Sequence, residues 1–571
     1  MSRVVKGAKA GQQKARQPVI AKDTAASLST LKILYGLSEG EIVGLVDGAK
    51  SISLDGTQVM NDNNTPNFVD DKGNIGVVWD MRNGTNDQTH VAGFPLIENE
   101  TQVTRELKAG IPFTKTFTEP QLSAVRVRLF WDALKKQETN GDVKGVKVKY
   151  AIDLQTDSGA FVTVLNAEVN DKTSGKYERA HRIDLPEGKK WTIRVRRITP
   201  DSTSDLVSDK MYVDAVTEVI DAKLRYPNTA VLGVQYNAKT FSNVAKLAAR
   251  CRGRIIRVAA NYDPVNRTYS GLWDGTFKLA YTNNPAWVFL DLCTHWRYGL
   301  GSRIDLSMID KWSIYQLAQY CDQMVDDGKG GLEPRFTVNV YIQAQQDAFT
   351  VLQSLSSIFR AMSYWRGEQI IVDADMPSDP VYTFTQANVV EGKFEYTGTR
   401  ARDRHTVAKV AWDNPDNKFK TEYEPVRDEA AIAKHGVRVL DLSLMGCTSK
   451  GQAQRAGLWA LKSERLETRT VSFRTGLEGF LPNVGDIITV ADEIFAGRAI
   501  GGRVVSVTNQ TTLTLDRPSR VAVGDTLVVN TTSGVSQQRI VSAVSGTTVT
   551  VSAAFDKVEA PCVWAVNSPE D

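Results

Sequence analysis

One serine in the sequence stands in the pattern of a hydrolase nucleophile. Gly36, Ser38 and Gly40 form G-x-S-x-G directly after LKILY, which predicts a β-strand. In a nucleophile elbow a helix follows the serine at once, so that its hydroxyl is exposed at the helix start. The residues that follow here, EIVGLVDG, are β-branched and rich in turn formers. We therefore expect a tight turn between strands at this serine, and no hydrolase site.

Metal and cofactor sites have no local support either. The five histidines form no H-x-H, H-x-x-x-H or H-E-x-x-H pattern, and the five cysteines form no C-x-x-C pair. Two glycine-rich pieces, GKGG (328–331) and AGRAIGG (496–502), lack the Lys-Ser/Thr of a phosphate-binding loop and are expected to be turns. The sequence predicts no cofactor and no metal. The residues concerned are His90, His181, His295, His405, His435, Cys251, Cys293, Cys321, Cys447 and Cys562.

Carboxylates and tryptophans are the remaining candidates for chemistry. Asp326, Asp327, Asp413 and Asp416 lie in loop-like stretches, where aspartate usually shapes turns. Glycosidases need two carboxyl groups about 5–9 Å apart across a sugar, a separation that sequence does not show. The 11 tryptophans are scattered over the whole chain, which favours packing in cores and interfaces over a sugar-stacking platform. No catalytic residue is predicted, and the protein is expected not to be an enzyme.

Length and composition bound the class of protein. A chain of 571 residues is too long for one hydrophobic core, so several domains are expected. A formal net charge of +3 gives no reason to expect a general nucleic-acid binder. No stretch approaches the roughly 18 apolar residues of a membrane span. The start of the chain is basic but has no apolar region, so it does not resemble a secretory signal. The odd number of cysteines is typical of folding in a reducing cytoplasm.

Residues 1–28 are predicted to be a basic flexible arm. They carry too few apolar side chains to offset the entropy of ordering. Two interpretations stay open: a disordered terminus, or an arm that orders against a neighbouring subunit. The basic residues are Arg3, Lys6, Lys9, Lys14, Arg16 and Lys22.

Residues 97–220 are predicted to form a β-sandwich. Apolar residues alternate with Arg or Lys in AVRVRLFW (124–131), VKVKY (146–150) and WTIRVR (191–196). Strands with one buried face show this period of two, and the charges then form a solvated outer face. A nucleic-acid track is the alternative. On both sides of this stretch, residues 29–96 and 221–277 are rich in short strands, with hairpin-type turns expected at Asp47-Gly48 and Asp55-Gly56.

Helices are predicted in a mixed α+β domain, residues 278–480. Asn284 and Pro285 are a good N-cap and first helical residue, and Ser313 is expected to precede a second helix. A third helix is expected from about 345 to 362 and a fourth over 451–467, with strands at 368–374 and 469–475. The apolar face of the third helix would contain Phe349, Leu352, Leu355, Phe359 and Met362.

A weak internal repeat predicts a small β-barrel at residues 481–571. VGDIITV (484–490) is echoed by VGDTLVV (523–529), and RVVSVTNQTTLTL (503–515) by RIVSAVSGTTVTV (539–551). Two copies of a strand–turn–strand unit are typical of a small closed sheet.

Several ordered blocks of sequence resemble the lambda-type phage tail tip attachment protein J family. They extend over most of the chain, from about residue 30 to 565. The blocks are LYGLSEGEIVGLVDGAKSISLDGT (34–57), GFPLIENE (93–100), NYDPVNRTYSGLWDGTFK (261–278), NNPAWVFLDLCTHWRYGLG (283–301), KWSIYQLAQYCDQMVDDG (311–328), EPRFTVNVYI (333–342) and GCTSKGQAQRAGLWALKSE (446–464).

This resemblance implies a fold class: mainly β with an α+β domain, in a baseplate-hub-like architecture of β-barrels and an inserted β-sandwich. Residues 29–96 and 221–277 would together form a discontinuous hub β-barrel around the sandwich. It also implies a homotrimeric hub at the distal end of a non-contractile tail. Such a hub lies below the distal tail protein ring, binds the tape measure protein C-terminus and other tail tip proteins, nucleates tail assembly, and opens for DNA ejection. DNA would be present only in transit.

Family members are usually much longer and end in a receptor-binding segment. We therefore expect this chain to be the hub portion, with host attachment through a further C-terminal region or through separate fibres. The protein would be located in the virion, at the tail tip, after assembly in the host cytoplasm.

Other functions remain as alternatives. One is a carbohydrate-active or cell-wall-cleaving tip protein, which would need paired acids in a cleft. Another is a direct adhesin for a surface receptor, which would need an exposed, loop-rich tip. The basic arm adds a further hypothesis, contact with DNA or with an acidic partner inside the tube, which strong salt dependence would support.

Overall fold

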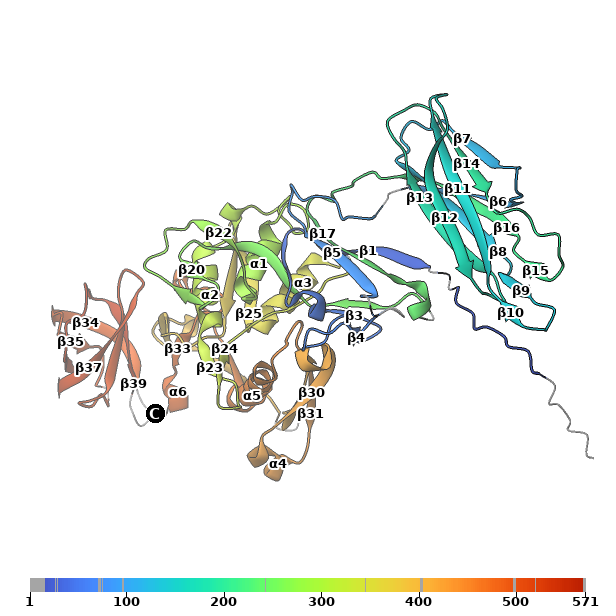
Figure 1. The fold of residues 1–571 in the computed structure, drawn as a ribbon. Coiled ribbons are helices and arrows are strands. Elements are labelled where there is room, and N and C mark those ends of the chain that lie inside the picture. The colour runs from blue at the N-terminus through green and yellow to red at the C-terminus, as the bar shows by residue number, and fades with distance from the viewer. Residues whose placement is uncertain are drawn as a thin grey trace, which may run out of the picture. The chain divides into compact units, whose positions relative to one another are not determined.

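A computed structural model shows a mainly β chain that divides into two compact units, Met1–Ile255 and Ile256–Asp571 (Figure 1). It describes residues 16–25, 27, 29–69, 73, 75–94, 97–241, 243–344, 346–400, 404–496, 500–518 and 520–567. Among these residues, no helix combines the length and the apolar character needed to cross a membrane. The predicted fold class, mainly β with an α+β part and several domains, is confirmed.

The first unit contains a β-sandwich of two four-stranded antiparallel sheets (Figure 1). The predicted strand at 124–131 is β8, and those at 146–150 and 191–196 lie in β11 and β14. One sheet has the order β12 (Val162–Asp171), β11 (Val146–Thr156), β14 (Trp191–Arg197), β7 (Phe113–Phe117). The other has the order β13 (Tyr177–Asp184), β8 (Ala124–Trp131), β16 (Met211–Ile220), β6 (Ile97–Glu106). A small sheet, β10 (Val143–Lys144), β9 (Lys135–Gln137), β15 (Val207–Ser208), completes this part.

The alternating pattern of β14 shows why these residues form a sandwich. Trp191, Ile193 and Val195 are buried between the sheets. The residues between them point outward, where Arg194 Nε and Arg196 Nε lie 2.7 and 2.6 Å from Asp153 Oδ2. The Arg196 and Arg194 guanidinium groups hold the pKa of Asp153 well below its usual range. The prediction of a charged outer face is confirmed, because these arginines pair within the sheet itself.

The second half of the predicted arm lies along this sandwich. Val143 N donates to Val19 O, and Ala21 N donates to Val143 O, both at 3.0 Å. Lys172 Nζ pairs with Asp23 Oδ1 at 2.5 Å, and Ala25 packs against the sandwich core. Residues 16–25 and Ser27 are therefore anchored to their own chain, in contrast to the expected flexible arm. Arg3, Lys6, Lys9 and Lys14 lie outside the described residues.

The remaining strands of the first unit come from both sides of the sandwich in sequence. Residues from 31–81 and from 232–249 share one core around Ile52, Leu232 and Tyr236. The described strands form small separate sheets here, and the domain limits stay a prediction. The sheets are β1 (Thr30–Glu39), β17 (Thr229–Asn237), β5 (Val77–Asn83); β18 (Leu247–Ala249), β3 (Ile52–Leu54), β4 (Thr57–Gln58); and β2 (Ile42–Leu45) with β19 (Cys251–Ala259).

Only one of the two predicted hairpin turns in this part is a hairpin. Asp55 and Gly56, at φ 46° and 83°, form the two-residue turn between β3 and β4, as the Asp-Gly pair predicts. Gly48 instead begins a short 3-10 helix, Gly48–Ser51, after Asp47. The Asp47-Gly48 prediction is wrong, because a Gly at positive φ serves helix starts as well as hairpins.

The second unit contains the helices. The N-cap prediction at Asn284 is confirmed, since its side chain accepts a hydrogen bond from Ala286 N. The N-cap of the second helix is Asp310 and not Ser313, because the carboxylate accepts from two backbone N–H groups and from the Ser313 hydroxyl. The helices are α1 (Pro285–Thr294), α2 (Lys311–Asp322), α3 (Ala348–Ile358), α4 (Glu429–His435), α5 (Lys450–Leu466) and α6 (Glu493–Ala496).

The third helix is shorter than predicted. It ends at Ile358, and Arg360 at φ 57° turns the chain into β25 (Ala361–Arg366), which pairs with β26 (Gln369–Ala374). Met362 therefore lies in a strand. Helices α1, α2 and α3 pack with this hairpin around one large core that includes Trp287, Phe289 and Phe359.

Short strands make up much of the rest of the second unit. The segment before α1 contains β20 (Tyr262–Asp263), β21 (Thr268–Tyr269) and β22 (Phe277–Tyr281). The others are β23 (Met324–Asp326) with β24 (Leu332–Pro334), β27 (Tyr382–Thr385) with β33 (Ile488–Ala491), β28 (Glu395–Gly398) with β32 (Arg469–Ser472), and β30 (Lys420–Arg427), β29 (Val407–Asn414), β31 (Val439–Ser443).

The chain ends in a closed six-stranded barrel. Both predicted strand–turn–strand units are in it, and β35 pairs with β38, so the two copies are neighbours. The first VGD strand is not in the barrel, because β33 pairs in parallel with β27. The barrel order is β34 (Gly501–Asn509), β35 (Thr512–Leu515), β38 (Thr548–Val551), β37 (Ser536–Ser545), β36 (Thr526–Asn530), β39 (Cys562–Asn567).

Helix α5 packs on the β29–β30 sheet, and Gly457 lies at the point of close contact. A Cβ atom at Gly457 would stand 2.7 Å from Val426 Cγ2 and 3.0 Å from Val410 Cγ2. Branched side chains of the sheet therefore occupy the space that any larger residue would need, and this close approach requires glycine.

We expect Gly457→Ala to destabilise the second unit by about 1–3 kcal/mol, because overpacking outweighs the gain in helix propensity. Chemical denaturation of the full chain measures the change. Gly476→Ala is the matched control, since a Cβ at this position meets no atom within 4 Å. Equal stability of the two variants would contradict the close packing of α5.

Candidate interaction surfaces

The structure places the candidate nucleophile in a strand. Ser38 lies in β1, next to a register shift after Gly36, and its hydroxyl donates to Glu39 O at 3.2 Å. No helix follows, so the geometry of a nucleophile elbow is missing at this serine.

The histidines lie on separate elements and have structural partners. His295 is the C-cap of α1 and stacks on Tyr298 at 3.6 Å between ring centroids. His405 Nδ1 lies 3.0 Å from Glu464 Oε1, and His435 ends α4. The carbonyl of His90 accepts a hydrogen bond from Arg82. Within the described ranges, no three His, Cys, Asp or Glu residues gather as metal ligands would.

His181 differs from the other four histidines because its side chain points into the sandwich. Its Nε2 lies 2.7 Å from Tyr150 Oη, and Arg179 Nη1 lies 3.4 Å from the same oxygen. Burial lowers the pKa of His181 to about 4, and the charge of Arg179 adds to this effect. This group is a neutral core histidine at physiological pH.

The candidate aspartates and the cysteines serve the fold. Asp327 Oδ1 accepts from Lys329 N and Gly331 N in the β23–β24 turn, which confirms GKGG as a turn. Asp413 accepts from the Thr421 hydroxyl, and Asp416 lies in a short 3-10 helix. Burial raises the pKa of all five cysteine thiols, which makes them poor nucleophiles. In AGRAIGG, residues 497–499 lie outside the described residues.

One open hollow of about 530 Å³ lies at the end of the sandwich. Apolar side chains, Leu154, Val162, Val164 and Leu185, form most of its lining, and the carboxylate of Asp184 is paired with Arg182. A binding site for a small molecule usually has several converging polar groups, so this hollow indicates no particular ligand.

Exposed apolar side chains are the more informative feature. Leu477 and Phe480 are 84% and 80% exposed on a short 3-10 helix, Leu477–Phe480. Further exposed apolar residues follow in the next 15 positions, in the turns and loop before β33 and in α6. We call residues 477–495 the apolar segment; its other exposed members are Leu481, Val484, Ile487, Ile494 and Phe495.

Two contacts fix the position of the apolar segment within the second unit. Strand β33 pairs with the buried β27 through Tyr382–Ile488 to Thr385–Ala491. Phe495 stacks on Tyr396 at 5.3 Å between centroids. Apolar side chains on an ordered backbone that remain exposed to water mark an interaction surface.

A second exposed apolar site lies in the loop of residues 261–277. Trp273 is buried, stacks on Tyr315 at 4.7 Å and contacts Trp312 at 5.0 Å. Its neighbour Leu272 is 100% exposed, and the buried Trp273 fixes the position of the backbone beside it. Sequence analysis missed both surfaces, because a period of two or 3.6 identifies buried faces and not exposed ones.

Two family models match the chain. The model of the tip attachment protein J FNIII-A domain matches residues 97–222, which is the sandwich. A phage tail protein model, Phage-tail_3, matches residues 347–507, which includes the apolar segment.

Curated relatives match almost the whole chain. The tip attachment protein J of Escherichia phage SECphi27 is 37% identical over 99% of this chain and 47% of its own length. That of Escherichia phage SECphi4 is 38% identical over 97% of this chain and 49% of its own length. The chain thus spans about half the length of these relatives.

Likeness to solved structures is low. The virion of a native gene transfer agent particle is similar over 60% of this chain and 69% of its own, with 14% identity and a TM-score of 0.31. This similarity is too low to support a conclusion about fold or function.

We expect the sandwich to lose stability in acid through His181. Its pKa in the folded chain, about 4, is lower than the ordinary 6.5, so protonation favours the unfolded state. Stability is full above pH 6.5 and falls as pH drops towards 4.

Hydrogen exchange of peptides from β11 and β13, in the full chain between pH 4 and 7, measures this loss after correction for intrinsic rates. His181→Gln should flatten the dependence, and the exposed His435→Gln should leave it unchanged. Identical profiles for wild type and His181→Gln would contradict the assignment.

Proposed function

Because this chain belongs to the tip attachment protein J family, we propose that it is the central hub of a phage tail tip. In this proposal three copies form a ring that closes the distal end of the tail tube. The function is structural: the hub holds neighbouring tail proteins and opens when DNA leaves. The relatives are tip attachment proteins, and the proposal for this chain adds the trimer, the order of assembly and the opening.

The partners in this proposal are the distal tail protein ring, the tape measure protein C-terminus and other tail tip proteins. The hub would nucleate tail assembly in the host cytoplasm and remain in the virion. DNA would only pass through, in agreement with the small net charge of +3. We place host attachment in the part of the family that this chain does not span, or on separate fibres.

The observation that supports this proposal most strongly is the apolar segment. A closed ring needs a surface on each subunit that becomes buried only on assembly. The apolar segment offers seven exposed large apolar side chains in the second unit, on a short 3-10 helix, in the turns and loop before β33 and in α6. Burying such side chains contributes about 25 cal/mol for each Å² removed from water, so this surface can supply a large part of a subunit interface.

We expect the double substitution Leu477→Ser and Phe480→Ser to prevent trimer formation. Light scattering and native mass spectrometry of the purified full chain, alone and with its distal tail protein, measure the assembly. Both side chains are largely exposed, so the free subunit should keep its thermal stability.

The matched control is Ile540→Ser, since Ile540 is 56% exposed on the barrel strand β37. The control should assemble like wild type. A wild-type chain that stays monomeric in both conditions would overturn the ring, and assembly of the double variant would overturn the role of the apolar segment.

A further inference from the structure

Three arginines from three separate elements of the second unit lie together. Arg335 directly follows β24, Arg360 follows α3, and Arg455 is on α5. Arg455 Nη2 donates to Arg335 O at 3.0 Å, and Arg360 Nη2 donates to Arg455 O at 3.3 Å. Backbone carbonyls therefore connect the three residues, which we call the arginine cluster.

Aromatic rings hold two of these guanidinium groups in place. Arg335 stacks on Tyr320 at 4.5 Å from the ring centroid. Arg360 lies over Trp459 at 5.0 Å and over Phe336 at 5.5 Å. A guanidinium that stacks on a ring keeps its N–H edge free for a planar anion, and its orientation is set before the anion binds.

Only one arginine of the cluster, Arg455, forms an ion pair with a carboxylate among the described residues. Glu333 Oε1 pairs with Arg455 Nη1 at 2.6 Å, and Glu333 Oε2 accepts from the Ser449 hydroxyl at 2.5 Å. Over the part of the chain that the structure describes, no carboxylate lies within ion-pair distance of Arg335 or Arg360. Arg335 and Arg360 are thus without an ion-pair partner, although the charge of Asp375 acts on Arg360 from a longer distance.

The arginine cluster also contains features that destabilise the free subunit. The Nε–H groups of all three arginines are buried without a hydrogen-bond partner. Burial lowers the pKa of Arg360. Tyr320 and Asp375 oppose this effect, and the nearby charges of Arg335 and Arg455 add to it. Unsatisfied donors and repelling like charges are destabilising in a free subunit, and an anion would relieve the repulsion.

We propose that Arg335 and Arg360 bind a carboxylate on an acidic segment of a partner protein. The inference goes beyond the hub function and does not depend on the trimer, since it concerns a different surface from the apolar segment. Arg335 Nη2 already donates to Gln323 Oε1 at 3.0 Å, and Arg360 Nη2 to Arg455 O at 3.3 Å. The donors left for the carboxylate are therefore the Nη1 groups and the second proton of each Nη2. Their fork geometry fits the two oxygens of a carboxylate.

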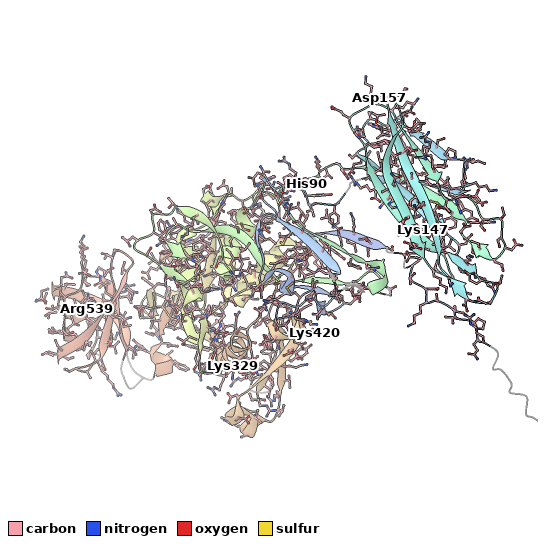
Figure 2. All side chains as sticks on the ribbon, in the orientation of Figure 1. His90, Lys147, Asp157, Lys329, Lys420 and Arg539 are labelled. Atoms are coloured by element: carbon pink, nitrogen blue, oxygen red, sulfur yellow. The ribbon has the colours of Figure 1, made fainter. Side chains whose placement is uncertain are left out.

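The surroundings favour a single carboxylate over a nucleic-acid backbone. Asp326 and Asp327 lie in the adjacent hairpin, whose turn also carries Lys329, labelled in Figure 2. Asp375 accepts from Trp459 Nε1 at 2.6 Å, and its backbone N–H donates to Arg360 O at 3.0 Å. These carboxylates make no ion pair with Arg335 or Arg360, and their charge repels a polyanion more strongly than a single carboxylate.

The first test measures the melting temperature of the full chain in tricarballylate, in phosphate and in chloride at equal ionic strength. We expect tricarballylate to raise the Tm of wild type saturably, by about 3 °C at ten times its Kd, relative to chloride. Arg360→Met and Arg335→Met keep the apolar part of the side chain and should lose this rise.

Arg539→Met is the matched control, since Arg539 stacks on Phe555 in the barrel, away from the cluster in sequence and core. It should respond like wild type. No rise in wild type, or loss of the rise in the control as well, would overturn the site. A response to phosphate and to a short DNA duplex, but not to tricarballylate, would overturn the carboxylate in favour of a nucleic acid.

The second test identifies the partner in the phage that encodes the chain. Arg360→Glu should lower the yield of assembled tails by about tenfold or more, because like charges then face each other. Second-site revertants should replace an acidic residue of another tail protein by Lys or Arg. Normal yield, or revertants confined to this chain, would contradict binding to a partner protein. Either outcome is independent of the trimer measured by light scattering and mass spectrometry.

Discussion

The sheets that the structure describes are small, and this constraint shapes the rest of the fold. Outside the closed barrel, the described sheets have two to four strands, too few to be stable unless one face is buried against a second layer. Each part therefore builds its own core: the sandwich around Trp131, the helical part around Trp287, the barrel around Trp564. The result is a set of rigid modules with separate cores.

Modules of this kind keep their functional groups on their outer surfaces. In the described ranges, serine, histidine and aspartate side chains are used for turns, caps and core hydrogen bonds, and they do not converge. What remains available is apolar surface at residues 477–495 and positive charge at Arg335 and Arg360. Apolar burial supplies affinity without direction, whereas paired charges select the partner and its orientation.

Much of the fold could be predicted because its signals are local. The period of two in AVRVRLFW specifies β8, Asn284 with Pro285 specifies the start of α1, and Asp55-Gly56 specifies a hairpin turn. Predictions failed where two local signals compete. Asp310 and Ser313 are both good caps three residues apart, and the carboxylate with its two backbone donors prevails. Helix α3 ends at Ile358, and Arg360 takes a left-handed conformation that turns the chain into the β25–β26 hairpin.

The sequence by itself determined the family, the succession of strand-rich and helical parts and the lack of a catalytic motif. Those properties follow from residue type and short-range spacing. Only the tertiary structure decided that residues 16–25 lie along the sandwich, that β33 pairs with β27 outside the barrel, and that three arginines gather where the one paired carboxylate, Glu333, binds Arg455. Each of these contacts joins residues far apart in the chain. Their energy depends on burial and on the distance between groups, which short-range patterns do not contain.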